Sequence, residues 1–267
     1  MGEFRGRVLA IGGSDPGGGA GIQADIKTVT ALGGYAASVI TAVTVQNSRG
    51  VSAVQLISAE MIEAQGRAVL GDIGADAIKI GMLGTIAAIE VVARLIDSAP
   101  ATPVVVDPVM VAKGGRDLLE PSAIDALRAL LIPGCALVTP NAPEALALTG
   151  IAIVVTDDLR RAGEALLRMG ARAVLMKGGH VDGDTVVDLL MTPAGETTFS
   201  GPRIASRHTH GTGCTLASAC ATGLAQGMGL DAAVARAWGY TAQAIRHAPG
   251  FGAGHGPLDH GWTFRER

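Results

Sequence analysis

The chain has few aromatic residues and few cysteines. Aromatic residues make up 3% of its 267 residues, whereas hydrophobic residues reach 48%. The core must therefore consist of Ala, Val, Ile and Leu, which suit buried parallel strands and packed helices. The three cysteines (Cys135, Cys214 and Cys220) have neither the pairing of a disulfide framework nor the CxxC spacing of a zinc site. We expect at least one free thiol and no structural metal.

Charge of one sign and long apolar runs are also lacking. The 24 acidic and 21 basic residues nearly balance, and no basic run is interleaved with aromatic residues. Every apolar run stops well short of the roughly 18 residues that cross a bilayer. The run at residues 8–11 is too short for the core of a signal peptide. We therefore expect a cytoplasmic protein without nucleic-acid or membrane partners.

Two common nucleotide-binding motifs are missing as well. No Gly-Lys-Ser or Gly-Lys-Thr occurs in the chain, which excludes a P-loop. The glycine cluster GGSDPGGGAGIQAD (residues 12–25) is a poor dinucleotide fingerprint, because no Asp or Glu lies between Asp25 and Glu60 to bind a ribose. We expect neither motif to operate here.

Short apolar runs alternate with helical patterns along the chain. The runs predict strands at residues 7–11, 38–45, 77–80, 103–107, 136–139 and 173–177. Apolar residues spaced three and four apart predict helices at residues 85–97, 122–131 and 157–169. This alternation predicts an α/β fold whose mostly parallel sheet is covered on both faces. Without repeats, linkers or composition shifts, we expect a single domain over residues 1–267.

Polar clusters follow several of the predicted strands. Ligands of open parallel sheets bind beyond the carboxyl ends of the strands, so these clusters are expected to line one site. Asp107 and Glu144 could hold Mg²⁺ through waters, and Lys177 could reach a phosphate. For Lys177, the alternative is an exposed lysine before a turn. For Glu144, the alternative is a capped helix start, with Asn141 as N-cap and Pro143 in the first turn.

The segment GTGC (residues 211–214) leads from a loop into a small-residue helix that ends at Gly227. Free N–H groups and the positive end of the helix dipole favour an anion there. The same position lowers the pKa of a thiol in favourable cases. Cys214 is then a base, a nucleophile or a small buried residue. Cys220, inside the helix, fits packing better.

Eight segments together resemble the hydroxymethylpyrimidine and phosphomethylpyrimidine kinases of thiamine biosynthesis, members of the ribokinase-like superfamily. They are GGSDPGGGAGIQAD, TVQN, KIGMLG, DPVMVAKGG, TPNAPEA, MKGGH, THGTGCT and GHGPLDH. The resemblance covers about residues 8–260, in order and without a large insertion. It implies a three-layer α/β/α domain that transfers the γ-phosphate of ATP. The acceptors would be 4-amino-5-hydroxymethyl-2-methylpyrimidine and then its monophosphate. The resemblance also favours a homodimer.

For the pyrimidine, the resemblance implies contacts with Asp25 and Gln46 and walls formed by Gly13, Met82 and Val109. A glutamine amide offers a donor and an acceptor side by side, which suits a ring nitrogen beside an exocyclic amine.

For the transferred phosphate, the resemblance implies four backbone N–H donors at Gly211, Thr212, Gly213 and Cys214. Cys214 stands where the wider superfamily has an aspartate base, so it would accept the hydroxyl proton in the first transfer.

For the nucleotide, the resemblance implies ATP contacts from Asn141, Lys177 and Thr212. Asp107 and Glu144 would organise Mg²⁺. The segment MVAKGG (residues 110–115) would form a flap over the substrate.

The sequence departs from the family in two places and leaves three rival functions open. Ser48 and Arg49 stand where a threonine and another small or polar residue are usual, and Asp259 replaces a common asparagine. One rival is a pyridoxal kinase of similar fold, although Gln46 and Met82 favour the pyrimidine. A second is an ATP-independent enzyme with Cys214 as nucleophile and His208 or His210 as base. The third is an inactive nucleotide-binding regulator.

Overall fold

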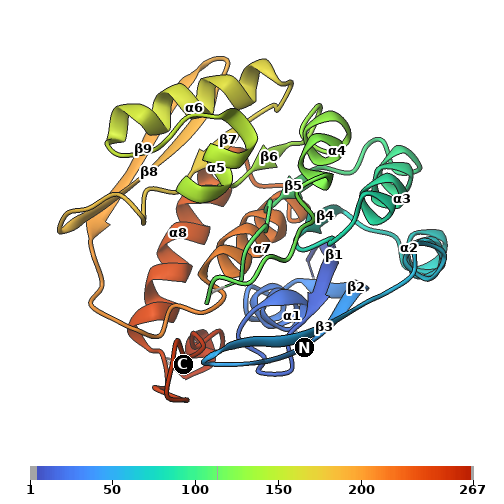
Figure 1. Ribbon diagram of the computed structural model, residues 1–267, viewed down its shortest axis with the longest axis horizontal. Helices are drawn as coiled ribbons and strands as arrows, with labels where there is room; N and C mark the ends of the chain where they lie inside the picture. The colour runs from blue at the N-terminus through green and yellow to red at the C-terminus, as the bar shows by residue number, and fades with distance from the viewer. Residues whose placement is uncertain (1–4, 113, 266–267) are drawn as a thin grey trace.

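Within the part of the chain that the structure describes, nine strands form one sheet in the order β3-β2-β1-β4-β5-β6-β7-β8-β9 (Figure 1). The computed structural model describes residues 5–112 and 114–265. The strands are β1 (Arg7–Ser14), β2 (Tyr35–Asn47), β3 (Gly50–Leu56), β4 (Ala77–Ile80), β5 (Val104–Val106), β6 (Leu137–Val138), β7 (Val174–Met176), β8 (Thr185–Thr192) and β9 (Gly195–Pro202).

The sheet is parallel in its middle and antiparallel at both ends. The pairs β2–β1, β1–β4, β4–β5, β5–β6 and β6–β7 are parallel. The pairs β2–β3, β7–β8 and β8–β9 are antiparallel. All six predicted strands are confirmed, and the mostly parallel sheet with them. The edge strand β9 is mostly exposed, with the polar sequence GETTFSGP, and it lacks the apolar run on which the predictions relied.

Helices cover both faces of this sheet. They are α1 (Gly21–Ala31), α2 (Ala59–Asp72), α3 (Ile86–Asp97), α4 (Ala123–Leu130), α5 (Ala142–Thr149), α6 (Thr156–Arg168), α7 (Thr212–Ala225) and α8 (Leu230–Arg246). Figure 1 shows α2 to α6 following one another from its right side to its top, while α1, α7 and α8 pack together. The three predicted helices match α3, α4 and α6, and the three-layer prediction is confirmed.

The strands divide their apolar side chains between two cores. Successive strand residues point to opposite faces, so Val105 packs with α7 and α8 whereas Val106 packs with the helices of the other face. Within α7, residues 215–223 are all buried, and all except Leu216 are small: Thr, Ala, Ser, Cys and Gly. Their size lets α7 lie close to α1, α8 and the sheet, with its N-terminus near the ends of the strands.

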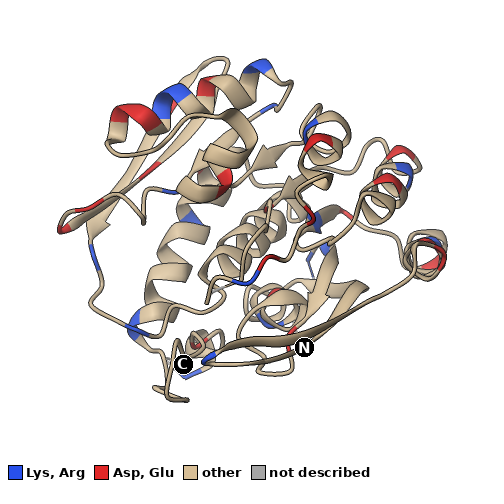
Figure 2. Cartoon of the chain, in the orientation of Figure 1, with Lys and Arg blue, Asp and Glu red and all other residues tan. Residues whose placement is uncertain are grey.

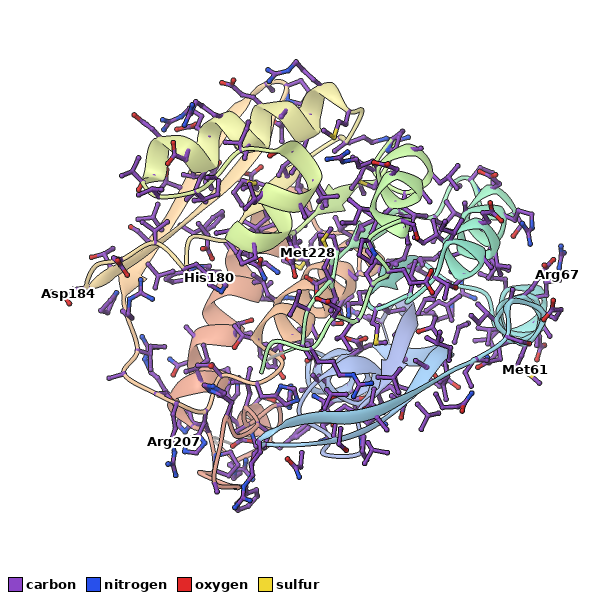
Figure 3. All side chains as sticks on the ribbon, in the orientation of Figure 1. Met61, Arg67, His180, Asp184, Arg207 and Met228 are labelled. Atoms are coloured by element: carbon purple, nitrogen blue, oxygen red, sulfur yellow. The ribbon has the colours of Figure 1, made fainter. Side chains whose placement is uncertain are left out.

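The outer helices carry charges of both signs. Figure 2 shows acidic and basic residues interspersed on α6, where Arg160 lies 2.6 Å from Asp157. On α2, Met61 and Arg67 point away from the fold (Figure 3), and Met61 is 56% exposed. In residues 5–112 and 114–265, no helix has the length and apolarity to cross a membrane.

Candidate active site

The N-terminus of α7 sits tightly against the loop that follows β1. Gly211 caps this helix with a φ of 84°, a backbone conformation that glycine adopts without strain. A Cβ at this position would collide with the carbonyl oxygen of Gly19. The first N–H groups of a helix have no partner within the helix. Those of Gly213 and Cys214, in the first turn of α7, therefore have no partner within the helix, and their contact with an anion stays a prediction.

Gly213 brings this helix end next to two charged side chains. A Cβ at Gly213 would lie 3.2 Å from Nζ of Lys177 and 3.5 Å from Oδ2 of Asp107. Lys177 follows β7 and Asp107 follows β5, so the carboxyl ends of two strands meet the start of α7. The structure thus places side by side three features that the sequence analysis considered separately: Lys177 for a phosphate, Asp107 for Mg²⁺, and the segment 211–214 for catalysis.

Asp107, Lys177 and Glu144 form a buried cluster of charges. Lys177 Nζ donates to Asp107 Oδ1 at 2.9 Å and lies 3.7 Å from Glu144 Oε2. The Thr139 hydroxyl also donates to Asp107 Oδ1, at 3.2 Å. Asp107 is 1% exposed and Glu144 7%. The alternative of an exposed lysine before a turn is therefore wrong, because the side chain of Lys177 is only 13% exposed.

The cluster perturbs the protonation of its members. Burial raises the pKa of Glu144, the Asp107 carboxylate raises it further, and the pKa reaches about 7 although Lys177 opposes this. Burial also acts to raise the pKa of Asp107, but Lys177 and Lys79 outweigh it and hold that pKa below its usual value. Two carboxyl groups thus share one nearby ammonium, which leaves the cluster short of positive charge.

Glu144 also caps a helix. Asn141 Oδ1 accepts from the Glu144 N–H at 3.0 Å, and Glu144 Oε2 accepts from the Asn141 N–H at 2.8 Å. This reciprocal pair is a capping box at the start of α5, with Pro143 in the first turn. The structural interpretation of this segment is confirmed. It does not exclude the functional one, because the same carboxylate faces Lys177.

Cys214 differs from the expectation for a thiol at a helix start. Burial raises its pKa to about 12, and the carboxylates of Asp25 and Asp107 contribute, although Lys79 acts in the opposite direction. The helix start, which lowers the pKa of a thiol in favourable cases, is therefore outweighed here by desolvation. Cys214 is partly exposed, whereas Cys220 is fully buried, which fits the packing role expected for Cys220.

Beneath Cys214 lies an ion pair of which the sequence analysis missed one member. Lys79 Nζ donates to both oxygens of Asp25, at 2.9 and 3.0 Å, and the Ser218 hydroxyl donates to Asp25 Oδ1 at 2.7 Å. Asp25 has no exposed surface, so its direct contact with a substrate stays a prediction. The sequence did contain a signal for this ion pair. Lys79 lies inside the four-residue strand AIKI, which is buried, and buried lysines require a partner.

The predicted pyrimidine residues lie at the ends of neighbouring strands. A Cβ at Gly13 would lie 2.9 Å from Met82 Sδ, so these two predicted walls touch. Val109 follows β5, and its N–H donates to the carbonyl of Asp107 at 2.8 Å. Gln46, at the end of β2, lies 2.9 Å from the Nε2 atom of His210. The sequence analysis considered His210 only as a possible base in the rival cysteine-nucleophile enzyme.

A cavity of about 300 Å³ opens beside Met82. It lies between Val54 and Leu56 of β3 and the segment 116–121. Arg116 ties this segment to β3, because its Nη1 donates to the Ser52 carbonyl at 2.6 Å. The predicted flap at residues 110–115 includes Lys113, which lies outside the described residues.

Comparisons with known proteins agree with the resemblance. The family model described as phosphomethylpyrimidine kinase matches residues 15–259. A hydroxymethylpyrimidine/phosphomethylpyrimidine kinase of Streptomyces coelicolor is 49% identical over 259 residues, covering 97% of this chain and 96% of that protein.

Solved structures of two kinds share the fold. A phosphomethylpyrimidine kinase of Clostridium difficile has a TM-score of 0.80 at 42% identity, covering 90% of this chain and 99% of its own. A Bacillus subtilis pyridoxal kinase, solved as an ADP complex, has a TM-score of 0.91 at 34% identity, covering 98% and 100%. Backbone similarity alone therefore does not separate the two substrates.

Proposed function

This chain belongs to the phosphomethylpyrimidine kinase family, and from that premise we propose that it phosphorylates 4-amino-5-hydroxymethyl-2-methylpyrimidine with ATP. A second transfer to the monophosphate gives the diphosphate used in thiamine biosynthesis. One observation carries the proposal: at Gly213, the N-terminus of α7 lies directly beside the side chains of Lys177 and Asp107. That arrangement supports phosphoryl transfer, which depends mainly on positioning and electrostatic stabilisation.

Positive charge and N–H donors act on the transferred phosphoryl group. We assign this role to the backbone N–H groups of Gly211, Thr212, Gly213 and Cys214, of which that of Thr212 also donates to the Thr209 carbonyl at 3.4 Å. Lys177 adds an ammonium, since the carboxylates of Asp107 and Glu144 outweigh the effect of burial and raise its pKa. Preorganised donors of this kind stabilise developing charge without reorganising during the reaction. Asn141 and Thr212, at the starts of α5 and α7, are proposed as further nucleotide contacts.

Asp107 and Glu144 fit a magnesium ion. Both are buried oxygen donors close to Lys177. The raised pKa of Glu144 reflects chiefly its burial, and the Asp107 carboxylate contributes to it. Among the described residues, no three His, Cys, Asp or Glu side chains group as a complete metal site. This suits Mg²⁺, which usually takes one or two carboxylates together with phosphates and waters. When bound, the ion would neutralise charge on the nucleotide phosphates.

We assign Cys214 as the acceptor of the hydroxyl proton in the first transfer. With a pKa of about 12, the thiol of Cys214 keeps its proton at neutral pH. The base role therefore requires that ligand binding lowers this pKa. The Asp107 carboxylate contributes to the raised value, so neutralising it favours the thiolate. The second acceptor is a phosphate that is already anionic, and it needs no such base.

The substrate pocket is proposed between Gln46, at the end of β2, and walls formed by Gly13, Met82 and Val109. Pyridoxal is the second candidate substrate, because the Bacillus subtilis neighbour is a pyridoxal kinase. The pyrimidine is favoured because identity is higher to the proteins named for it. We also propose a homodimer and a cytoplasmic location, supported by the resemblance to this kinase family. Light scattering of the purified protein tests the dimer.

One assay tests the function. ADP release from ATP is measured with the pyrimidine alcohol, with its monophosphate and with pyridoxal, and kcat/KM is compared. We expect release that depends on both pyrimidine compounds. A higher kcat/KM for pyridoxal would contradict the choice of substrate. Turnover without ATP would favour the cysteine-nucleophile enzyme, and no turnover with any acceptor would favour an inactive regulator.

A further inference from the structure

His210 connects the loop before α7 with the loop after β1 and with the end of β2. Its Nε2 atom lies 2.9 Å from Oδ2 of Asp15 and 2.9 Å from the side-chain amide of Gln46. Arg207, labelled in Figure 3, belongs to the same loop as His210. His210 is 9% exposed and Asp15 is 2% exposed. One ring nitrogen of His210 therefore lies within hydrogen-bond distance of both the Asp15 carboxylate and the Gln46 amide.

The surroundings of Asp15 decide which groups carry protons. The backbone N–H groups of Gly19 and Ala20 donate to Asp15 Oδ2 at 3.1 and 2.9 Å, and that of Gly17 donates to Oδ1 at 2.8 Å. Burial acts to raise the pKa of Asp15, but His210 and these N–H groups outweigh it and lower the pKa. Asp15 is therefore an ionised acceptor. The ring atom facing it must be an N–H, so Nε2 of His210 carries a proton.

That proton constrains the amide of Gln46. A donating Nε2–H requires an acceptor on the glutamine, whereas the amide nitrogen of Gln46 is the atom placed 2.9 Å away. The amide oxygen and nitrogen exchange places on a half-turn about the last side-chain bond, and hydrogen-bond partners decide between the two. With Oε1 toward His210, the contact becomes a hydrogen bond instead of two facing donors.

The other side of the amide agrees with this half-turn. The hydroxyl of Thr44 donates its only proton to the carbonyl of Ser14 at 2.9 Å. The hydroxyl oxygen can therefore only accept a hydrogen bond from Gln46, whose Oε1 atom is the one placed 3.3 Å away. An amide nitrogen there satisfies Thr44, whereas an amide oxygen does not. The network then runs from the Asp15 carboxylate through His210, Gln46 and Thr44 to the backbone. The single Nε2–H of His210 is shared between Asp15 Oδ2 and the amide oxygen of Gln46, as a three-centre hydrogen bond.

We propose that His210, held by Asp15, is a positioning residue that fixes the Gln46 amide with its oxygen toward His210. One N–H of the amide is bound to Thr44, and the second remains for the substrate. The amide then offers the substrate a donor alone, instead of the donor and acceptor pair expected from the sequence. The pocket therefore selects a ring that presents a hydrogen-bond acceptor, such as a pyrimidine nitrogen, at this point. The inference rests on the proposed function, because it takes Gln46 to contact the pyrimidine.

A double-mutant cycle tests the coupling. His210→Leu removes the donor, and the KM for the pyrimidine alcohol should rise about tenfold or more, as loss of an oriented hydrogen bond predicts. The KM for ATP should stay within about twofold of its original value. In a Gln46→Ala background the same change should raise the pyrimidine KM less than about twofold, since coupled residues are not additive. Additive losses, or an equal rise in the KM for ATP, would overturn the proposal.

Two further variants separate positioning from packing. His210→Gln keeps an N–H near the place of Nε2, so it should recover much of the pyrimidine affinity that His210→Leu loses. His255→Leu serves as the matched control, because His255 is exposed and its ring contacts the Arg207 carbonyl. We expect the control to keep the original KM values. Equal defects in the Gln and Leu variants of His210 would contradict the proposal.

Nitrogen NMR tests the inference without any turnover. We expect a protonated Nε2 in His210, and a shift of the Gln46 side-chain amide signals in His210→Leu that His255→Leu does not cause. A neutral ring protonated only at Nδ1 would refute the inference. If ADP release does not depend on the pyrimidine while these signals behave as expected, the proposed function fails but the orientation of Gln46 stands.

Discussion

Lys79→Met tests how much the buried ion pair of Lys79 and Asp25 contributes to stability. In the folded protein, Lys79 and Asp25 are 1% and 0% exposed, and the ammonium donates to both carboxylate oxygens. The variant leaves the Asp25 carboxylate buried with only the Ser218 hydroxyl as a side-chain donor. Removing one partner of a buried pair costs about 3–5 kcal/mol of unfolding free energy. For a domain of this size, that corresponds to a Tm lower by roughly 10 °C.

The unfolding free energy that Lys79→Met loses should increase with pH. Burial raises the pKa of Asp25 even with Lys79 present, and removing the ammonium raises it further. An acid whose pKa is higher in the folded state contributes stability below its unfolded pKa and loses it as pH rises through the folded pKa. The difference in unfolding free energy between Lys79→Met and the original protein should therefore be smaller near pH 5 than near pH 8.

Urea unfolding of four proteins provides the assay. The original chain, Lys79→Met, Asp25→Asn and the double variant are compared at both pH values. The double variant should recover at least half of the Lys79→Met loss, because it contains no unpaired buried charge. Arg7→Met, which breaks the exposed pair with Asp76, should cost much less. Additive losses in the double variant, or a Lys79→Met loss that does not change with pH, would refute the reasoning.

Three further predictions concern the phosphate side of the site. Cys214→Ala should slow the first transfer about 100-fold, as loss of a general base predicts, and the second less than about tenfold; equal losses in single-turnover assays would show positioning instead. Because Glu144 has a pKa of about 7, calorimetry should show Mg·ADP binding that strengthens from pH 6 to 8 as this carboxyl loses its proton. Glu144→Gln should abolish that dependence, and a persistent dependence would assign it elsewhere. Gly213→Ala places a methyl group 3.2 Å from Lys177 Nζ, so kcat should fall at least about tenfold while Tm stays or rises through helix propensity. Gly211→Ala, at a φ of 84°, should instead lower Tm, and a stable, fully active Gly213→Ala would contradict the proposed phosphate site.

Buried parallel strands could be predicted from the sequence because each one is a short apolar run. The run at residues 77–80 matches β4 at both ends. Antiparallel edge strands could not be found in this way. β9 has one face open to solvent and consists mostly of polar residues, and β3 is only partly buried. Pairing with a neighbouring strand, which no local pattern encodes, makes them strands.

The candidate site was predictable where chemistry and position coincide in the chain. Asp107 and Lys177 are each the last residue of a predicted strand, and parallel topology places both at one edge of the sheet. The partners of Lys79 and His210 lie far away in the sequence, so no local pattern reveals what these side chains hold. The pKa of Cys214 was misjudged for the same reason. Burial is a property of the folded chain, and it outweighs the local effect of the helix start.

The site draws on both ends of the chain, which has a consequence for its synthesis. Asp15 contacts His210 across 195 positions, and Asp25 contacts Ser218 across 193. A ribosome that has completed the first six strands has therefore made β1 and β4 but not the helix that closes over them. Contacts between residues so distant in sequence form late and slowly. Until α7 emerges, the nascent chain exposes an apolar sheet face and a charged pair without its cover, a species prone to aggregate and a natural client for chaperones.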